Sequence, residues 1–86
     1  MANAQERGEK FMPIYQRLKD LREDEDKSQA EIAEVIGTSQ QYYGKYETGQ
    51  RPIPFERVIE LAKYYNVTID YIAGLTNEKR PLYRKK

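Results

Sequence analysis

The sequence lacks several residue types and patterns, and each absence excludes a class of function. None of its 86 residues is a cysteine or a histidine. This excludes disulfide scaffolds, thiol catalysis and cysteine-based metal centres, and it removes the usual general base. No run approaches the ~18 apolar residues of a membrane-spanning helix, and the N-terminus lacks a signal peptide's apolar region. We therefore expect a cytoplasmic protein with no metal, no cofactor and no membrane partner.

Catalytic motifs are also missing. The one segment similar to a phosphate-binding loop has six residues between Gly37 and the Gly44-Lys45 pair instead of the motif's usual four. Tyr46 stands where that loop needs a magnesium-binding serine or threonine. The acidic run at 23–26 lacks the spacing and the glycine of a calcium-binding loop. We do not expect an enzyme, and no small-molecule ligand is evident.

The charge is present but unevenly distributed. The formal net charge of +1 arises from a strongly basic end, because residues 77–86 carry +4. A smaller excess of +1 lies at 37–51, and the three remaining segments, 1–26, 27–36 and 52–76, are each net acidic. A near-neutral total therefore does not exclude a polyanionic partner that binds one local surface.

Apolar spacing and capping residues predict an all-α fold of five helices, without the alternation typical of strands. The expected helices cover 13–23, 29–36, 40–47, 55–65 and a short segment from Thr68 or Asp70 to Ala73. We expect a flexible arm at 1–11, a globular domain at 12–76 and a basic tail at 77–86. The side chains expected in the core are Ile14, Leu18, Leu21, Ile32, Ala33, Ile36, Tyr43, Tyr46, Phe55, Val58, Ile59, Ala62 and Tyr65.

The second and third predicted helices form a helix-turn-helix. Ser28 and Glu31 have the spacing of a capping box, which marks a helix start. The turn is the segment 37–39, in which Gly37 ends one helix and Ser39 can cap the next. Ala33 is small, as it must be where the following helix crosses over it.

These stretches resemble the lambda-repressor-like, Xre-type helix-turn-helix family of phage and bacterial regulators. The resemblance covers about two thirds of the chain, from Tyr15 to Leu75. The matching segments are Arg17-Leu18-Lys19-Asp20-Leu21-Arg22, Ser28-Gln29-Ala30-Glu31-Ile32-Ala33, Lys45-Tyr46-Glu47-Thr48-Gly49 and Asn66-Val67-Thr68-Ile69-Asp70-Tyr71-Ile72. The resemblance implies a five-helix globule that binds operator DNA as a two-fold dimer.

Four residues of the third predicted helix are candidates for reading bases. Gln40 and Gln41 stand at its N-terminus, where such contacts are made, and a glutamine amide can pair with adenine N6 and N7. They are also similar to a glutamine pair that one branch of the family uses for this purpose. Tyr42 and Lys45 are expected on the same outward face. The alternative for the glutamines is a solvated helix surface, and for Tyr42 it is a protein contact.

Four further residues are candidates for phosphate contacts. Gln29 begins the second predicted helix, whose free N–H groups favour anions. Ser39 precedes the third helix, and Gln50 and Arg51 follow it. Such contacts fix the position of a protein on DNA without reading its sequence.

The resemblance also implies a buried ion pair between Arg22 and Glu47, which we expect to be structural. Three sites depart from the family pattern: Tyr43 replaces an aliphatic residue, Asp26-Lys27 a Gly-apolar pair, and Pro54 a serine or threonine cap. For Tyr43 this implies a larger core or a hydroxyl bonded at the surface.

Gly44 lies in the middle of a predicted helix, where glycine is unfavourable. It either permits close approach of a phosphate or relieves crowding among the neighbouring tyrosines.

The sequence therefore predicts a sequence-specific transcriptional regulator, a repressor, which binds a palindrome of double-stranded DNA as a homodimer. The alternative is a protein-interaction module with the same fold, such as an antitoxin or a co-regulator. For the dimer surface the candidates are Tyr64, Tyr71 and Leu75, and Leu82 and Tyr83 of the tail offer a second possibility.

Overall fold

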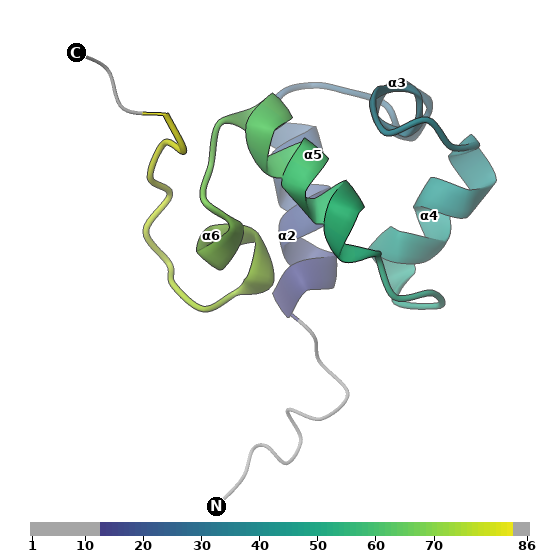
Figure 1. The fold of residues 1–86 in the computed structure, drawn as a ribbon. Helices are drawn as coiled ribbons and strands as arrows, with labels where there is room; N and C mark the ends of the chain where they lie inside the picture. Colours follow the sequence, from purple (N-terminus) through teal and green to yellow (C-terminus); the bar gives the residue numbers. More distant parts are fainter. Residues whose placement is uncertain (1–12, 84–86) are drawn as a thin grey trace, which may run out of the picture.

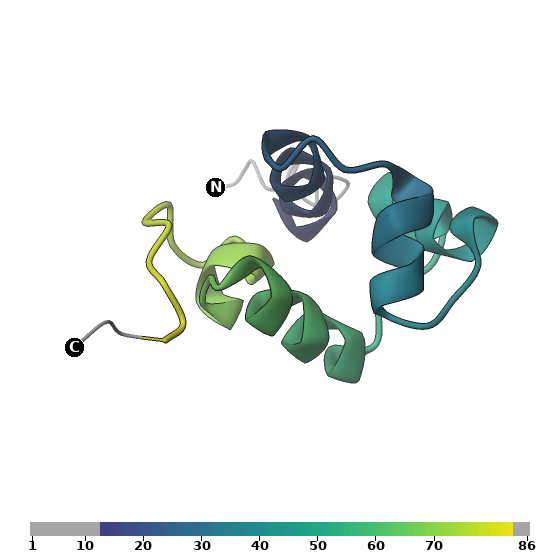
Figure 2. The same ribbon diagram turned by 90° about the horizontal axis from the view of Figure 1, so that it is seen from above.

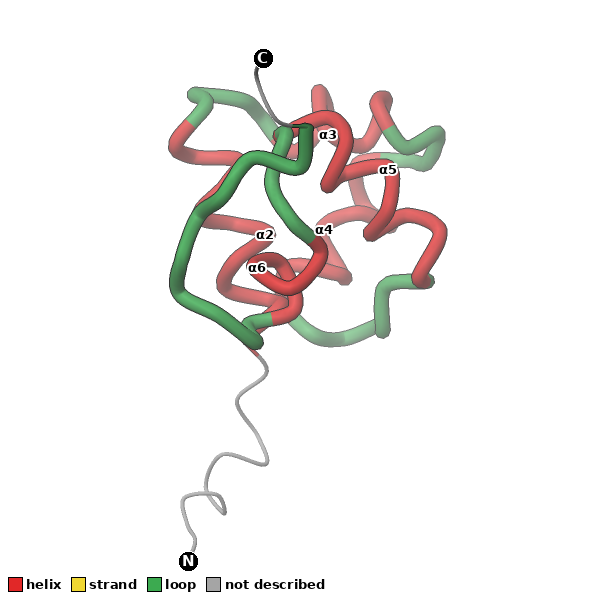
Figure 3. Tube along the Cα trace, turned by 60° about the vertical axis from the view of Figure 1, so that its left-hand side comes forward, coloured by secondary structure: helices red, strands yellow, loops and turns green. Residues whose placement is uncertain are grey.

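The computed structural model describes residues 13–83, and every regular element in that range is a helix (Figures 1 and 3). The helices are α2 (Pro13–Asp24), α3 (Gln29–Val35), α4 (Gln40–Thr48), α5 (Phe55–Tyr65) and α6 (Ile69–Ala73). These bounds agree with the predicted ones to within one residue, so the all-α, five-helix expectation is confirmed. The predicted arm at 1–11 and the tail residues 84–86 lie outside the described range.

The helix boundaries follow from local hydrogen bonds. The Glu31 N–H donates to Ser28 Oγ at 3.1 Å and the Ser28 N–H donates to Glu31 Oε1 at 2.8 Å, which completes the predicted capping box. Ser39 Oγ accepts from the N–H of Tyr42 at the start of α4. Gly37 has a φ of 74°, a left-handed conformation that glycine adopts without penalty. The predicted helix-turn-helix is therefore α3, this turn and α4.

The helices pack in two groups around α2. Figure 2 shows α3 and α4 together on one side of the molecule and α6 on the other, and α2 contacts both α4 and α6. The fully or nearly fully buried side chains are Leu18, Leu21, Ile32, Ala33, Ile36, Tyr43, Tyr46, Val58, Leu61, Ala62, Val67 and Ile72. None of the described helices has the length and apolarity needed to cross a membrane.

The predicted core was wrong about one end of α5. Phe55 is 63% exposed, whereas Leu61, which was not predicted, is completely buried. The buried arc of α5 is centred on Val58, Leu61 and Ala62. Phe55 is the first residue of this helix and lies at the edge of that arc, so its ring is not covered. The predicted helical spacing of α5 was right, but its buried face is turned away from Phe55 toward Leu61.

The departures at 26–27 and at Pro54 leave the fold intact. Asp26 adopts the left-handed φ of 58° that a glycine would adopt freely. The Lys27 carbonyl accepts a hydrogen bond from Arg22 Nη1 at 2.9 Å, so its backbone serves the structure even though its side chain is charged. Pro54 is the N-cap of α5 without a side-chain hydrogen bond, and its carbonyl accepts from the N–H of Val58.

The segment after α6 returns along the domain. Arg17 of α2 donates to the carbonyls of Tyr71 and Thr76, and its guanidinium lies 4.0 Å from the centre of the Tyr71 ring. Leu82 packs against the core, and the Tyr83 N–H donates to Asn66 Oδ1 at 2.9 Å. The described part of the predicted tail, 77–83, therefore contacts the domain at several points along its length.

Candidate nucleic-acid interface

The two faces of α4 differ sharply in burial. On the inner face Tyr43 and Tyr46 are 0% and 2% exposed, and both belong to the core as predicted. On the outer face Gln40 and Gln41 are exposed. This division follows from the helical period, which places side chains three and four residues apart on the same side. The outer face is therefore available for contacts that the domain itself does not use.

An open hollow of about 400 Å³ lies on the outer face of α4. It is lined by Gln29, Gln40, Gln41, Gly44, Lys45, Thr48 and Gln50. Five of these seven are DNA-contact candidates from the sequence, three as base-reading and two as phosphate-contacting residues. The structure thus brings side chains of α3, α4 and the following loop to one surface that is rich in amide groups and carries a cation.

The other three sequence candidates do not line the hollow. Tyr42 lies on the flank of α4, where its ring meets Tyr46 edge-to-face at 5.6 Å and the guanidinium of Arg51 lies 5.4 Å from the ring centre. Ser39 is occupied as the N-cap of α4. The backbone N–H of Arg51 donates to the carbonyl of Lys45 at 3.2 Å, which fixes the loop after α4 and leaves the side chain exposed.

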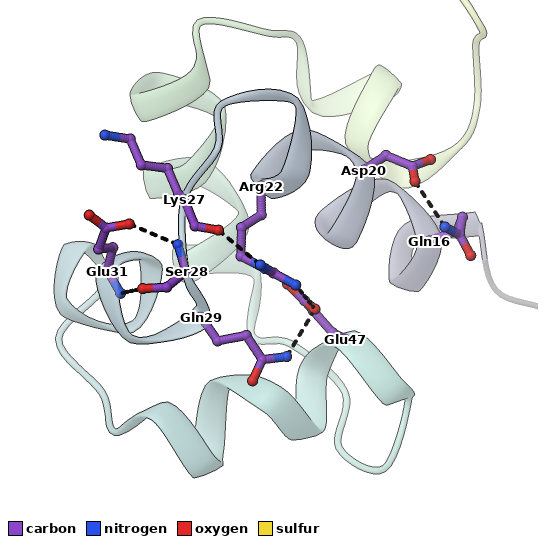
Figure 4. Close-up of polar contacts among 8 residues, drawn as sticks. All are labelled: Gln16, Asp20, Arg22, Lys27, Ser28, Gln29, Glu31 and Glu47. Carbon is purple, nitrogen blue, oxygen red and sulfur yellow. Dashed lines mark hydrogen bonds and ion pairs between the residues drawn. The ribbon is translucent and has the colours of Figure 1, made fainter.

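A network of charged and polar side chains surrounds Glu47 (Figure 4). Arg22 Nε donates to Glu47 Oε2 at 2.7 Å and Arg22 Nη2 donates to Glu47 Oε1 at 3.2 Å. The two side chains are only 13% and 3% exposed, so the expected buried pair is confirmed. Gln29 Nε2 donates to the same Glu47 Oε1 at 3.1 Å. The carboxylate therefore joins α2, α3 and α4 at one point.

Both partners of this pair are charged at neutral pH. Burial opposes ionisation of Glu47, but hydrogen bonds from Arg22 and Gln29 outweigh it and hold the pKa of the carboxyl below its ordinary value. The hydrogen bond to Glu47 raises the pKa of Arg22. The Glu47 charge is compensated inside by Arg22, so the uncompensated charges of segment 37–51 are those of the half-buried Lys45 and the exposed Arg51. The local field at the outer face is therefore more positive than the sequence count indicates.

Tyr43 enlarges the core, which was one of the two expectations for it. Its hydroxyl is buried, so the alternative of a hydroxyl bonded at the surface is wrong. Burial raises the pKa of Tyr43 and likewise that of Tyr65, whose hydroxyl is also buried. Neither phenol ionises at physiological pH, and both rings serve as packing.

The surroundings of Gly44 were not anticipated from the sequence. A Cβ atom at this position would lie 3.2 Å from Oε1 of Gln29, closer than ordinary van der Waals contact. The side chain that crowds the site thus comes from α3, and none of the neighbouring tyrosines lies as near. The signal available in the sequence was the glycine itself, placed on the outward face of a helix where alanine would be more favourable.

Three comparisons place this geometry among known proteins. The helix-turn-helix family model matches residues 18–72. The chain is 37% identical over 71 residues to an uncharacterized HTH-type transcriptional regulator of Bacillus subtilis, YobD, covering 83% of the chain and 63% of the relative. It is 34% identical over 73 residues to the cryptic phage CTXphi transcriptional repressor RstR of Vibrio cholerae, covering 83% and 65%. The chain thus spans less than two thirds of the length of these relatives.

The fold comparison agrees. A crystal structure of a transcriptional regulator from Listeria innocua superposes with a TM-score of 0.71, at 24% sequence identity, and the match covers 78% of this chain and 63% of that one. At this identity the likeness concerns the arrangement of helices. It supports the packing of α3 and α4 described above.

Proposed function

The chain belongs to the helix-turn-helix family, and on this premise we propose that it is a transcriptional regulator, a repressor, that binds double-stranded DNA sequence-specifically. The observation that carries the proposal is the outer face of α4, where Gln40, Gln41 and Lys45 line one open hollow while Tyr43 and Tyr46 anchor the helix in the core. A helix held in this way can enter a major groove without disturbing the fold.

In the proposed complex the outer face of α4 reads base edges. The amides of Gln40 and Gln41 can each pair with adenine, and the Lys45 ammonium can donate to guanine O6 and N7. Each well-formed pair contributes about 1–3 kcal/mol of discrimination against the wrong base. Tyr42, 37% exposed on the flank of α4, is proposed to contact a base at the edge of the footprint.

Phosphate contacts are proposed on both sides of α4. Arg51 is exposed and Gln50 lines the hollow, and both follow the helix. Ser39 lies at the N-terminal end of α4, where its exposed hydroxyl accepts a hydrogen bond from the Tyr42 N–H. Gln29 was also predicted from the sequence as a phosphate contact, and the structure holds its amide beside α4 through Glu47.

We further propose that the protein acts as a homodimer on a palindrome, with half-sites one helical turn, about 34–36 Å, apart. The name of the Vibrio relative supports repression. Of the candidate dimer contacts, Tyr64 and Leu75 are 42% and 77% exposed. Tyr71 is half-buried beneath Arg17 and is the weaker candidate.

Selection of bound duplexes from a random DNA pool tests the proposal. We expect enrichment of a two-fold symmetric sequence, bound by two protomers per duplex. At one fixed salt concentration, the protein should bind the enriched duplex at least about a thousandfold more tightly than a scrambled duplex. Equal affinity for both duplexes would contradict the proposal and favour the alternative of a protein-interaction module.

A further inference from the structure

The residue in the middle of the outer face of α4 has no side chain, which leaves a gap on this face. Gly44 occupies this position and lines the hollow together with Gln40 and Gln41. Glycine is among the least favourable residues in a helix interior. Nothing in the backbone of α4 requires it there, because within residues 13–83 the left-handed glycines are Gly37, Gly49 and Gly74. The reason for Gly44 must therefore lie in what approaches it.

The group that approaches is the side-chain amide of Gln29. Its Oε1 lies where it would be 3.2 Å from a Cβ on residue 44, and its Nε2 donates to Glu47 at 3.1 Å. Glu47 is itself held by two hydrogen bonds from Arg22. The amide from α3 is thus fixed over α4 by a rigid partner on one side and admitted by the missing side chain on the other.

We infer that Gln29 is a base-reading residue, whose amide occupies the place on the α4 surface that Gly44 leaves open. The inference rests on the proposed function and goes beyond the phosphate contact expected for Gln29. The bond to Glu47 uses one of the two amide hydrogens, so the other hydrogen and Oε1 can face a base edge. An adenine, with a donor at N6 and an acceptor at N7, matches this pair.

The two roles of Gln29 predict different results on substitution. A phosphate contact contributes equally on every sequence, whereas a base contact changes the preference at one base pair. We therefore expect Gln29→Ala to reduce the preference at a single position of the selected duplex by about 5- to 150-fold, with much smaller effects on scrambled DNA. An equal loss of affinity on both duplexes would overturn the inference and leave Gln29 as a phosphate contact.

Gln16→Ala is the matched control. Gln16 is also an exposed helical glutamine, but it lies on α2 and donates to Asp20 at 2.9 Å, away from the network around Glu47 (Figure 4). This variant should show the wild-type sequence preference and affinity. A change in preference for Gln16→Ala as large as for Gln29→Ala would show that removing any surface glutamine has this effect, and would overturn the inference.

Gly44→Ala tests the role of the gap by separating stability from binding. Alanine favours the helix, but its methyl group must displace an amide that donates to the buried Glu47 carboxylate. The two effects oppose each other, so the melting temperature should change by less than about 4 °C. The added methyl group should displace the Gln29 amide and weaken the preference at the same base pair by about fivefold or more. An unchanged preference in the folded Gly44→Ala variant would show that Gly44 does not position Gln29 for reading, and would overturn this part of the inference.

The outcomes separate this inference from the proposed function. If the wild-type protein enriches no sequence, both are wrong. If it enriches a sequence whose recognition depends on Gln40 but not on Gln29, the proposed function stands and only the inference is wrong.

Discussion

The inner and outer faces of α4 both carry polar groups, but in opposite environments. On the inner face the Glu47 side chain is 3% exposed and bonded to Arg22 and Gln29, whereas the amides of Gln40 and Gln41 on the outer face meet solvent. A buried charge is tolerated only with partners, so the inner group is committed to the fold. The outer groups remain available to a ligand. Substitutions on the two faces should therefore affect different measurements.

The largest effect is expected at the buried pair. Arg22→Ala leaves the Glu47 carboxylate buried without its main partner and should lower the free energy of unfolding by about 3–5 kcal/mol. Urea unfolding followed by circular dichroism measures this loss. Sequence preference at conditions where the variant remains folded should be unchanged. Lost DNA binding at an unchanged stability would instead place Arg22 on the DNA surface.

Arg80→Ala is the control for that prediction. The distance from Arg80 Nε to Glu78 Oε1 is 2.7 Å, the same as in the Arg22–Glu47 pair, but these side chains are 69% and 65% exposed. Solvent screens such a pair, so the free energy of unfolding should change by less than about 1 kcal/mol. A comparable loss of unfolding free energy in the two variants would mean that the N–O distance of an ion pair matters more than its burial. That result would contradict the contrast between the buried and exposed groups of α4.

Acid should weaken the same pair by a smaller amount. Because the pKa of Glu47 is lowered in the folded protein, its contribution to stability is present above the ordinary carboxyl pKa and is lost as the pH falls through the folded value. Glu47→Gln removes this titration. The stability difference between wild type and Glu47→Gln should therefore shrink over the acid range below about pH 5, measured by urea unfolding. A constant difference across that range would show that Glu47 does not titrate abnormally.

On the outer face, Gln40→Ala should leave stability nearly unchanged and relax recognition. Loss of one amide that pairs with a base should reduce discrimination at one base pair by about 1–3 kcal/mol. Affinities for the selected duplex and its single-base variants, measured by fluorescence anisotropy, report this change. A loss of unfolding free energy comparable to that of Arg22→Ala would show that Gln40 belongs to the scaffold.

The smallest effect is expected at Lys45. Lys45→Ala should lower the slope of log affinity against log salt concentration by about one, because a cation that enters the groove displaces counterions from the DNA. Lys63→Ala, in the last turn of α5, is the matched control and should leave the slope unchanged. An identical slope for wild type and Lys45→Ala would exclude Lys45 from the electrostatic footprint.

The helix boundaries were predictable from the sequence because the interactions that set them are local. Ser28 and Glu31 are three residues apart, and Ser39 caps α4 by a bond to a residue three positions later. Asn66 ends α5 in a left-handed conformation, which asparagine tolerates better than most residues. Hydrogen bonds over such short spans depend little on the rest of the fold.

The candidate site was predictable only in part. The glutamines at the start of α4 were recognised from their position, but the orientation of Tyr42 toward Tyr46 and Arg51 was not. The pairing of Arg22 with Glu47 came from the family resemblance, because residues 25 positions apart have no local signal.

By itself, the sequence determined where each helix begins and ends, which face of α4 is apolar, and that no thiol or imidazole chemistry is available. Only the tertiary structure decided that Phe55 is uncovered, that Leu61 is central, and that the amide of Gln29 lies over Gly44. The physical reason is the range of the interactions. Caps and helical periodicity act within a few residues of the chain, whereas the direction of a buried arc and the filling of a gap depend on the helices packed against it.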